Sequence, residues 1–546
     1  MRLSYQLASS TPTREVFLAA LNETQAGIYF YQSDLKTKEF LTYFEIAQQA
    51  RTFIPMLSAL GIKQKTRVLL CAENTKEFVI AWFALLQIGA VPVPMPPSAT
   101  LAGDNQFAAR VEPMLAHHEH FICRQGDVDK LTTANITFIN IAGFSDCLET
   151  DSSPITLPSF ADSDEAFIQY TSGSTSAPKG IVINYRNIVE NTAALASATQ
   201  TNKQPTFLTW LPLYHDYGLI CNFMLCLLQG YDLIITLPMA FIKRPIKFLQ
   251  LVAQHQATSM CMPNFALEHI HKAVVQKQAA LDLDLSSVQW WSIGAEPISV
   301  QAMENLYQVL SPYGLAATAL SPSYGLAEAT VGVSVSRPNT PYETVLLNQR
   351  KVILNGQPIN GLEIEIRNKD KQGFGELWLR GDSIAKHAYV DGKKLSITDP
   401  KGYVFTKDIA AIISNQVVIS GRQDEMICLR GENIFPYDIE ALVRQLTELP
   451  IRRVACFFVP MNNSVKTVLM YESKEKHVHL HERLHQQIFA HIAAHSTLKV
   501  DEMIAVPTKA VPVTTSGKIQ RTKARNQYIQ TGYKDIAVLR TTRASA

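Results

Sequence analysis

The stretch Phe167–Ile183, FIQYTSGSTSAPKGIVI, places a loop of small and polar residues between two apolar runs. The flanking runs, Phe167–Tyr170 and Ile181–Ile183, are rich in β-prone residues and predict two strands. Glycines let a backbone approach a ligand closely, and successive N–H groups in such a turn form a concave site for an anion. The loop therefore predicts phosphate binding. The residues that we expect to contribute are Thr171, Ser172, Gly173, Ser174, Thr175 and Lys179.

The composition of this loop is also compatible with two other kinds of loop. Serine, threonine and glycine also make up ordinary surface loops, and composition alone leaves that interpretation open. A phosphate loop of the nucleoside-triphosphatase type needs glycine, four residues, and then Gly-Lys-Ser/Thr. Counting from Gly173, Pro178 stands where the second glycine is required, so the sequence excludes this motif.

The composition is that of a large globular enzyme without a general affinity for nucleic acid. The 546 residues suffice for about three to four domain-sized units. Hydrophobic residues make up 47% and charged residues 18%, and a net charge of +2 argues against electrostatic binding of nucleic acid. The eight cysteines lie mostly in apolar runs without a Cys-x-x-Cys pair, which predicts buried free thiols in a reducing compartment.

The apolar segments are too short for membrane insertion. The first residues, MRLSYQLASSTPTREVF, lack the long apolar core of a signal peptide. The longest apolar stretch, Leu219–Leu228, is well short of the ~20 residues that a membrane span needs. We therefore expect a buried helix there, no stable membrane insertion, and a cytoplasmic protein.

Helical and strand-like runs alternate along the first part of the chain. Arg67–Ala72 and Ala90–Met95 are typical of strands, and Thr75–Gln87 between them is typical of an amphipathic helix. Such alternation predicts an α/β fold with layered parallel sheets, in which ligands bind beyond the carboxyl ends of the strands. Further strands are expected at Phe121–Arg124, Thr137–Ile141, Thr206–Leu211, Asp232–Leu237, Thr258–Met262 and Val288–Ile293, and further helices at Tyr185–Ala198, Pro245–His255 and Asn264–Gln276.

The pattern changes after Gly332. Short strand-like runs and glycine-containing turns predict a small β subdomain over residues 332–421. Alternation then resumes, with strands expected at Val454–Val459 and Met503–Pro507 and a helix near 479–495. The tail after about Tyr528 is basic and polar, and we expect it to be loosely held. The predicted organisation is a large N-terminal domain of layered α/β sheets at 1–421, a hinge at 422–424, and a small α+β domain at 425–546.

The loop at 171–180 resembles the phosphate-binding signature of the adenylate-forming superfamily, which includes acyl-CoA synthetases, luciferases, peptide-synthetase adenylation domains and fatty acyl-AMP ligases. Ser176 stands where the family usually has glycine, and fatty acyl-AMP ligases often differ there too. The segment SPSYGLAEAT, 321–330, resembles the adenine-and-magnesium motif in its fatty acyl-AMP ligase form. This resemblance implies that Tyr324 stacks on adenine and Glu328 binds Mg²⁺, with Ser323 and Gly325 beside the nucleotide. A helix start with a solvated Glu328 is the alternative.

Two further segments resemble motifs that line the nucleotide and acyl pockets. WSIGAEP, 291–297, resembles the strand-end turn beside the adenine, which implies nucleotide contacts for Gly294, Ala295 and Glu296. A plain strand-to-helix turn is the alternative. LPLYHDYG, 211–218, resembles the motif that borders the acyl-carboxylate pocket, which implies that His215 contacts the carboxylate or gates the pocket. A purely structural histidine is the alternative.

The remaining matches lie toward the C-terminus. YVFTKDIA, 403–410, resembles the ribose-binding motif at Asp408, although Lys407 replaces a family glycine. ISGRQDEMICLRGENIFPYDIE, 419–440, resembles the inter-domain motif, with Arg422 on the ribose-contacting arginine and Asp424 on the hinge about which a mobile C-terminal domain rotates. VPVTTSGKIQR, 511–521, resembles the catalytic loop whose lysine, here Lys518, bridges the carboxylate and the α-phosphate.

The ordered set of matches, from Arg67 to Arg521, identifies the chain as a member of this superfamily, most similar to fatty acyl-AMP ligases. The resemblance implies that ATP and Mg²⁺ activate a carboxylic acid, such as a fatty acid, to acyl-AMP with release of pyrophosphate. The acyl group then passes to the phosphopantetheine thiol of an acyl carrier protein.

Two alternative functions stay open. An acyl-CoA synthetase is the first, because Lys179 is retained and the insertion typical of fatty acyl-AMP ligases is shortened here to Thr344–Ile353. A catalytically silent adenylate-binding protein is the second, because Ser176 and Lys407 replace family glycines. Retention of Glu328, Asp408, Arg422 and Lys518 argues against a silent protein.

Overall fold

The computed structural model divides the chain into two compact units. The first contains Met1–Arg367, Leu377–Thr406 and Ala411–Val418, and the second contains Asn368–Glu376, Lys407–Ala410 and Ile419–Ala546. The residues that the structure describes are 11–100, 104–131, 136–145, 153–171, 179–199, 205–277, 281–347, 350–429, 432–446, 449–461, 465–475, 477–495, 500–514, 518–534 and 536–542. Ser172, Gly173, Ser174, Thr175 and the family-glycine position Ser176 lie outside them.

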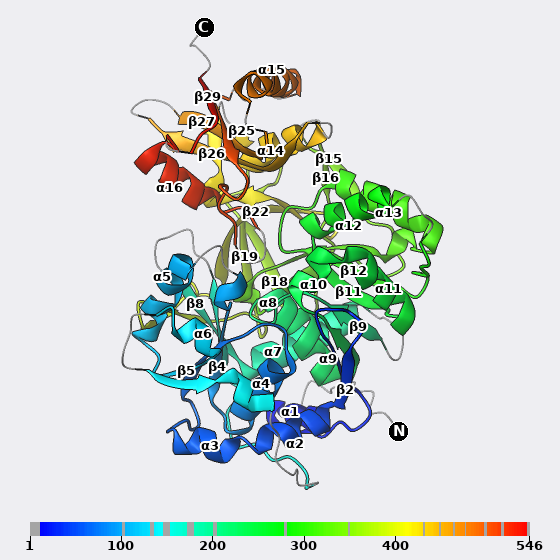
Figure 1. The fold of residues 1–546 in the computed structure, drawn as a ribbon, viewed down its shortest axis with the longest axis vertical. Coiled ribbons are helices and arrows are strands. Elements are labelled where there is room, and N and C mark those ends of the chain that lie inside the picture. The colour runs from blue at the N-terminus through cyan, green and yellow to red at the C-terminus, as the bar shows by residue number, and fades with distance from the viewer. Residues whose placement is uncertain are drawn as a thin grey trace. The chain divides into compact units, whose positions relative to one another are not determined.

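The largest sheet of the first unit orders its strands β17-β14-β13-β12-β11-β9-β10-β1-β2. Figure 1 labels β2, β9, β11 and β12 among them. The strands from β13 to β1 pair in parallel, whereas β2, β14 and β17 pair antiparallel at the two edges. Both β11 and β12 are buried along their whole length, as expected for parallel strands covered on both faces. The strands are β1 (Gly27–Tyr31), β2 (Lys38–Thr42), β9 (Thr206–Thr209), β10 (Asp232–Ile235), β11 (Ser259–Pro263), β12 (Trp290–Gly294), β13 (Leu320–Gly325), β14 (Gly332–Val335) and β17 (Gln357–Pro358).

A second sheet of this unit has the order β4-β3-β5-β6 and is parallel throughout, which confirms the parallel α/β expectation for the first 160 residues. The helix between its first two strands, α4 (Lys76–Gln87), begins where the Thr75 side chain accepts a hydrogen bond from the N–H of Phe78. From Phe78 onward every residue of α4 is buried. The strands are β3 (Arg67–Cys71), β4 (Val91–Met95), β5 (His120–Cys123) and β6 (Thr137–Asn140).

Helices of the first unit accompany these sheets. The apolar stretch Leu219–Leu228 is helical and buried, as expected, but it begins as a π-helix (Leu219–Met224) before α9 (Leu225–Gln229). The other helices are α1 (Thr13–Leu21), α2 (Tyr43–Arg51), α3 (Ile54–Ala59), α5 (Asp104–Leu115), α6 (Gln125–Val128), α7 (Tyr185–Thr199), α8 (Asp216–Gly218), α10 (Pro238–Lys243), α11 (Pro245–His255), α12 (Asn264–Gln276) and α13 (Val300–Leu310).

The strands that flank the polar loop belong to a third sheet, of order β21-β20-β8-β7. β7 (Glu165–Thr171) and β8 (Lys179–Asn184) pair antiparallel, and the pairing ends at Thr171 opposite Lys179. The two strands expected from the sequence are therefore present and slightly longer. The outer strands are β20 (His387–Val390) and β21 (Lys393–Ser396).

Strands dominate between residues 332 and 422, as expected. Within the part of this region that the structure describes there is no helix. A hairpin, β15 (Thr344–Leu347) and β16 (Arg350–Ile353), occupies the segment expected to be a shortened insertion. A four-stranded sheet has the order β18-β19-β22-β23. Its strands are β18 (Leu362–Arg367), β19 (Gly375–Gly381), β22 (Val404–Ile413) and β23 (Gln416–Arg422).

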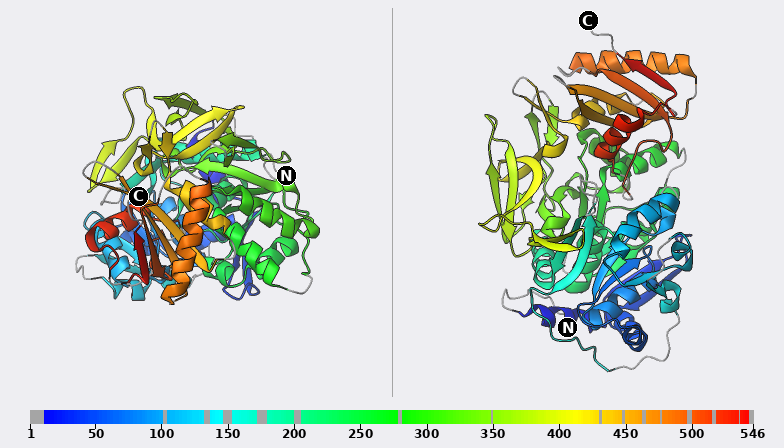
Figure 2. Two further views of the ribbon diagram at one scale, coloured as in Figure 1. Left: turned by 90° about the horizontal axis from the view of Figure 1, so that it is seen from above. Right: turned by 90° about the vertical axis from the view of Figure 1, so that its left-hand side faces the viewer.

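The second unit is built on the sheet β26-β27-β28-β29. Alternate residues of its strands enter two separate hydrophobic clusters, one with α14 and α15 and the other with α16, so helices cover both faces (Figure 2). A small hairpin, β24-β25, follows the hinge region. The elements are β24 (Ile427–Leu429), β25 (Glu432–Ile434), α14 (Pro436–Gln445), β26 (Ile451–Pro460), β27 (Val465–Ser473), α15 (Val478–His495), β28 (Glu502–Pro507), α16 (Arg521–Thr531) and β29 (Leu539–Thr542).

The expectation of a loosely held tail after Tyr528 is wrong. β29 pairs antiparallel with β28, and the side chain of Tyr533 is buried in the second cluster. Arg540 also donates to the buried Glu502 carboxylate. The polar composition of this segment suggested a free tail. Its order was not visible in the local sequence because the strand that pairs with it, β28, lies more than thirty residues earlier.

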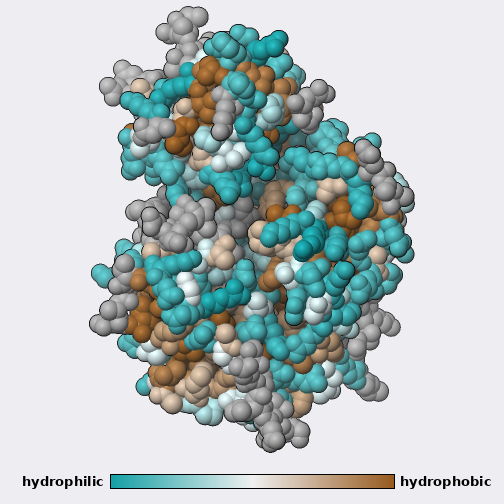
Figure 3. Space-filling model, viewed as in Figure 1, coloured by the Kyte–Doolittle hydropathy of each residue, from teal (hydrophilic) through white to brown (hydrophobic). Residues whose placement is uncertain are grey.

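The described residues contain no helix that is both long and apolar enough to cross a bilayer. On the face shown in Figure 3, hydrophobic residues lie in small groups among hydrophilic ones. Six of the described cysteines are buried free thiols: Cys71, Cys123, Cys221, Cys226, Cys261 and Cys456. The thiol prediction is therefore confirmed for these residues.

Candidate active site

The two ends of the polar loop are fixed by strand pairing. Thr171 ends β7 and Lys179 begins β8, directly opposite each other. The Lys179 side chain reaches Glu328, with 3.2 Å between Nζ and Oε1. Both side chains are partly exposed, at 32% and 21%. The structure thus brings together the lysine expected to bind phosphate and the carboxylate expected to bind a cation, although 149 residues separate them in the sequence.

The backbone around Glu328 is held from several sides. Glu328 lies in a short 3₁₀ turn, Ala327–Ala329, that follows β13. Its carbonyl accepts a hydrogen bond from the N–H of Ala385, and Asn191 of α7 donates to the carbonyls of Ala329 and Gly332. These contacts fix the backbone that carries the Glu328 carboxylate, which favours an electrostatic role.

Gly325 is required where the chain turns away from β13. A Cβ at this position would lie 1.9 Å from the carbonyl oxygen of Val331. This oxygen is backbone and cannot move aside as a side chain could. Tyr324, directly before Gly325, is partly buried on the same strand, so the ring predicted to stack on adenine lies next to the turn that leads to Glu328.

A buried hydrogen-bond chain joins three of the predicted motifs. The Tyr217 hydroxyl donates to Ser292 Oγ at 2.9 Å, and Ser292 Oγ lies 2.9 Å from Ser323 Oγ. Ser323 in turn donates to the carbonyl of Ile293. Burial raises the pKa of Tyr217 well above its ordinary value, so its hydroxyl remains neutral and can donate. Beside this chain, a Cβ on Gly294 would lie 2.7 Å from Ser323 Oγ, so a side chain here would displace Ser323 from the hydrogen-bond chain.

The turn after β12 also contains Ala295 and Glu296. Ala295 is exposed and adopts a positive φ of 65°, which is unusual for a residue with a Cβ. Glu296 accepts a hydrogen bond from the N–H of Phe265, at the start of α12, at 2.7 Å. Glu296 therefore binds the backbone at the start of α12, which is a structural role. Its expected position near the base stays a prediction.

His215 caps the short helix α8. Its Nδ1 lies 2.7 Å from Asp216 Oδ1, and the same carboxylate oxygen accepts the N–H of Tyr217 at 2.7 Å. The side chain is 36% exposed. Since Nδ1 faces this carboxylate, Nε2 is the ring atom left to meet a substrate.

Sequence reasoning missed Asn74, which holds the loop that leads to His215. Asn74 is buried three residues after the end of β3, and its amide nitrogen donates to the carbonyl of Leu211 at 2.8 Å. Its amide oxygen accepts from the N–H of Leu213 at 2.9 Å. An asparagine shortly after an apolar strand was the available signal, but the partners it binds lie about 140 residues later. Trp210, on the same loop, stacks on Phe241 with 4.2 Å between ring centroids.

Within the second unit, the predicted ribose-binding residues lie together. Arg422 Nε donates to Asp424 Oδ1 at 3.1 Å, and its Nη1 lies 3.8 Å from Asp408 Oδ1. Burial alone would lower the pKa of Arg422, but the Asp408 and Asp424 carboxylates raise it above its ordinary value. Lys407 adopts a positive φ of 65°, a conformation that the usual glycine would reach more easily.

Lys518 lies at the base of a small hairpin in the second unit. Its N–H donates to Thr514 Oγ1 at 3.0 Å, and its carbonyl accepts from the N–H of Thr514 at 2.7 Å. Val513 and Ile519 form a β-bridge beside these bonds. The backbone of the predicted catalytic lysine is thus fixed, while its side chain is partly exposed.

Comparison with known proteins decides the family. Residues 19–389 match the model of the AMP-binding enzymes. The chain belongs to the AMP-binding enzyme family. In this AMP-binding enzyme, residues 424–538 also match the model of the Disco-interacting protein 2-like AMP domain. The superfamily expected from the sequence is therefore confirmed.

Known relatives match this AMP-binding enzyme over most of its length. A 4-hydroxyphenylalkanoate adenylyltransferase of Mycobacterium marinum is 27% identical, with 98% of this chain and 93% of that protein covered. The medium-chain-fatty-acid–[acyl-carrier-protein] ligase JamA of Moorena producens is 28% identical, with 92% of each covered. A structure from a study of fatty acyl-adenylate ligases of E. coli and L. pneumophila superposes with a TM-score of 0.85 at 23% identity, covering 96% of this chain and 99% of that one. This likeness confirms the α/β fold class.

Proposed function

We propose that this AMP-binding enzyme uses ATP to convert a carboxylic acid to acyl-AMP, and then transfers the acyl group to the phosphopantetheine thiol of a carrier protein. The observation that carries the proposal is the Lys179–Glu328 pair at the mouth of the polar loop. It offers one cation for phosphate and one carboxylate for a metal in the same place. JamA, which is named as a fatty-acid ligase acting on an acyl carrier protein, supports the second step.

The chemistry explains why such a site is needed. A carboxylate oxygen of the acid forms a bond to the α-phosphorus of ATP, and the bond from that phosphorus to the pyrophosphate oxygen breaks. Two anions must meet, so positioning and charge neutralisation lower the barrier. We assign phosphate binding to the loop N–H groups and Lys179, adenine stacking to Tyr324, and ribose binding to Asp408 and Arg422.

Mg²⁺ fits the residues present. No group of three or more His, Cys, Asp or Glu side chains is placed to hold a metal anywhere in the described ranges. Mg²⁺, however, is commonly bound through one or two carboxylates together with substrate phosphates. Glu328 supplies one partly exposed carboxylate of this kind. When bound, Mg²⁺ would neutralise phosphate charge. We therefore propose ATP and Mg²⁺ as the cofactors.

Three further assignments belong to the proposal. Lys518 would bridge the carboxylate and the α-phosphate, Asp424 would act as the hinge, and His215 would meet the acyl carboxylate. The domain limits 1–421, 422–424 and 425–546 stay part of it. A cytoplasmic location is favoured by the buried free thiols, which reducing conditions preserve.

An acyl-CoA synthetase is the alternative that one observation favours. The segment Thr344–Ile353 folds as a short hairpin, β15-β16, rather than as a long insertion. A product assay by mass spectrometry separates the two functions. The protein is incubated with ATP, Mg²⁺, and short to long fatty acids and 4-hydroxyphenylalkanoic acids, with either CoA or a holo carrier protein.

The proposal predicts that acyl-AMP accumulates with CoA and is consumed by the carrier protein. Efficient formation of acyl-CoA would instead assign the protein to the synthetases. No adenylate with any acid of the panel would overturn the proposed function and favour a silent adenylate-binding protein.

Replacing the catalytic lysine tests the assignment of the first step. We expect Lys518→Ala to lower the rate of pyrophosphate release about 100-fold or more, since a cation that faces the reacting anions is lost. The measurement is a continuous pyrophosphate assay at saturating ATP. Lys523→Ala, an exposed lysine on α16, is the matched control and should keep the wild-type rate. A wild-type rate for Lys518→Ala would contradict the assignment.

A further inference from the structure

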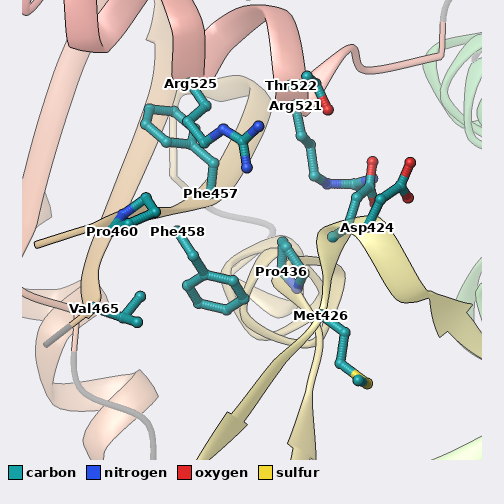
Figure 4. Close-up of a pocket in the computed structure, with 11 residues that line it drawn as sticks. Asp424, Met426, Pro436, Phe457, Phe458, Pro460, Val465, Arg521, Thr522 and Arg525 are labelled. Carbon is teal, nitrogen blue, oxygen red and sulfur yellow. The ribbon is translucent and has the colours of Figure 1, made fainter. Parts of the chain in front are cut away.

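Arg521 occupies a buried position directly after the hairpin that holds Lys518. It is the first residue of α16, and its side chain is only 8% exposed. The hairpin closes just before it, where the N–H of Gln520 donates to the carbonyl of Pro512. Figure 4 shows the Arg521 side chain extending from the start of α16 toward the turn that contains Asp424. Arg521, Asp424 and Glu425 are among the residues that line a pocket of about 160 Å³ in the second unit.

Two carboxylates from different elements bind the Arg521 guanidinium. Glu440 of α14 accepts two hydrogen bonds, from Nε at 2.7 Å and from Nη2 at 2.8 Å. Glu425 accepts a third, from Nη1 at 2.9 Å. Glu425 is the neighbour of Asp424 and ends the 3₁₀ turn Gln423–Glu425. One side chain therefore links the expected hinge turn, α14 and the end of the Lys518 hairpin.

Of the two carboxylates that bind Arg521, Glu440 is the more deeply buried and holds the guanidinium in place. Glu440 has no exposed side-chain surface, and it also accepts from the N–H of Cys456 at 2.9 Å. Burial alone would raise the pKa of Glu440, but the Arg521 guanidinium holds it below its ordinary value, so the carboxylate stays charged. A bidentate pair of this kind fixes the guanidinium in one orientation. The third N–H group is thereby aimed at Glu425.

We propose that the Glu425–Arg521 bond makes the hinge turn and the Lys518 hairpin move as one piece, so that Arg521 and Glu425 are positioning residues for Lys518. The inference rests on the proposed function, because Lys518 must act in acyl-AMP formation. Without the bond, the hairpin keeps its anchor on α14 through Glu440 but loses its connection to the turn at Asp424. When Asp424 changes conformation, the side chain of Lys518 would then be positioned less accurately relative to the carboxylate and the α-phosphate.

Glu425→Gln is the sharpest variant, because it removes the charge at the hinge end and leaves the buried pair with Glu440 intact. Loss of Arg521 itself would remove the bidentate partner of the buried Glu440 carboxylate and strongly destabilise the unit. Arg444→Gln is the matched control. Arg444 lies 3.4 Å from Glu440 and is 39% exposed, so this variant changes the charge near Glu440 without touching the hinge turn.

The test is a double-mutant cycle on the rate of acyl-AMP formation in the full chain. We expect Glu425→Gln to lower this rate about tenfold with unchanged KM for ATP, and Arg444→Gln to change it less than twofold. In a Lys518→Ala background, Glu425→Gln should cost less than twofold, since the residue it acts through is absent. An equal loss in both backgrounds, no loss with Lys518 present, or the same loss with Arg444→Gln would overturn the proposal.

Hydrogen exchange provides a readout that does not depend on activity. Glu425→Gln should speed exchange of the amides of Lys518 and Gln520, which donate within the hairpin to Thr514 and to Pro512. Unchanged exchange at both amides would overturn the coupling. If the wild-type protein makes no acyl-AMP, the proposed function fails, and this exchange measurement alone decides whether the hinge turn and the hairpin are coupled.

Discussion

At the residue scale, the candidate site rests on the pairing of Lys179 with Glu328. Lys179 begins β8 and Glu328 lies in the turn that follows β13, and each is of a type that binds one component of a nucleotide–metal complex. In the protein alone they neutralise each other. A metal–nucleotide complex would replace this contact with two others, Lys179 to phosphate and Glu328 to the cation.

Glu328→Gln tests this assignment. We expect the rate of acyl-AMP formation to fall about 100-fold and the Mg²⁺ concentration for half-maximal rate to rise, because a neutral amide oxygen is a weaker ligand than a carboxylate. The measurement is a Mg²⁺ titration of pyrophosphate release. Glu190→Gln is the control, because Glu190 pairs with Arg186 on α7. A wild-type Mg²⁺ dependence of Glu328→Gln would rule out the metal role.

At the scale of elements, β28 and β29 show how charge orders a polar segment. Glu502 begins β28 and is almost fully buried. It accepts from Tyr528 at 2.8 Å, contacts Lys466 at 2.5 Å, and accepts from Arg540 of β29. Burial alone would raise the pKa of Glu502, but these three partners together lower it. One of the basic residues that suggested a free tail, Arg540, is thus a partner of a buried carboxylate.

This lowered pKa makes a pH-dependent prediction. A carboxyl group whose pKa is lower in the folded than in the unfolded state adds stability above its unfolded pKa, about 4.3, and loses it as pH falls through the folded value. We therefore expect Glu502→Gln to cost about 1–3 kcal/mol of unfolding free energy at pH 7. This difference should shrink below about pH 4. Urea unfolding at both pH values measures it, with the exposed Glu482→Gln as control. An equal cost at low and neutral pH would contradict the lowered pKa.

At the scale of the whole molecule, the second unit has a core of its own. Both hydrophobic clusters around the β26–β29 sheet draw their buried members from residues 439–533. The short segments that the unit takes from earlier in the chain, 368–376 and 407–410, add no buried member to either cluster. A continuous piece of chain can therefore form the core.

We predict that residues 419–546, produced alone, fold cooperatively. The measurement is thermal unfolding followed by near-ultraviolet circular dichroism, which reports fixed packing of Tyr471 and Phe457, two buried aromatic residues of the clusters. A sigmoidal transition is expected, since each face of the sheet keeps its own helices. A fragment without a near-ultraviolet signal would show that the first unit is needed for folding.

The local pattern of the sequence determined most helices and strands of the parallel sheets, the strand-end turns and the family. Strand and helix periodicity located α11 and α12 at their observed limits and most strands of the parallel sheets within two residues, because burial on a sheet or helix face imposes that periodicity. Glycine-containing motifs located the strand-end turns, since a Cβ at Gly294 or Gly325 meets neighbouring atoms. Motif order also predicted the family.

The tertiary structure alone decided which distant residues meet. Asn74 was missed because the carbonyls it binds lie some 140 residues later, and β29 was missed because its partner strand and Glu502 supply the contacts that order it. The link from Glu425 through Arg521 to Glu440 likewise joins three elements whose separate sequences give no sign of it. Hydrogen bonds and ion pairs between distant segments depend on how the chain packs, and packing is a property of all the residues together, so no local pattern contains it.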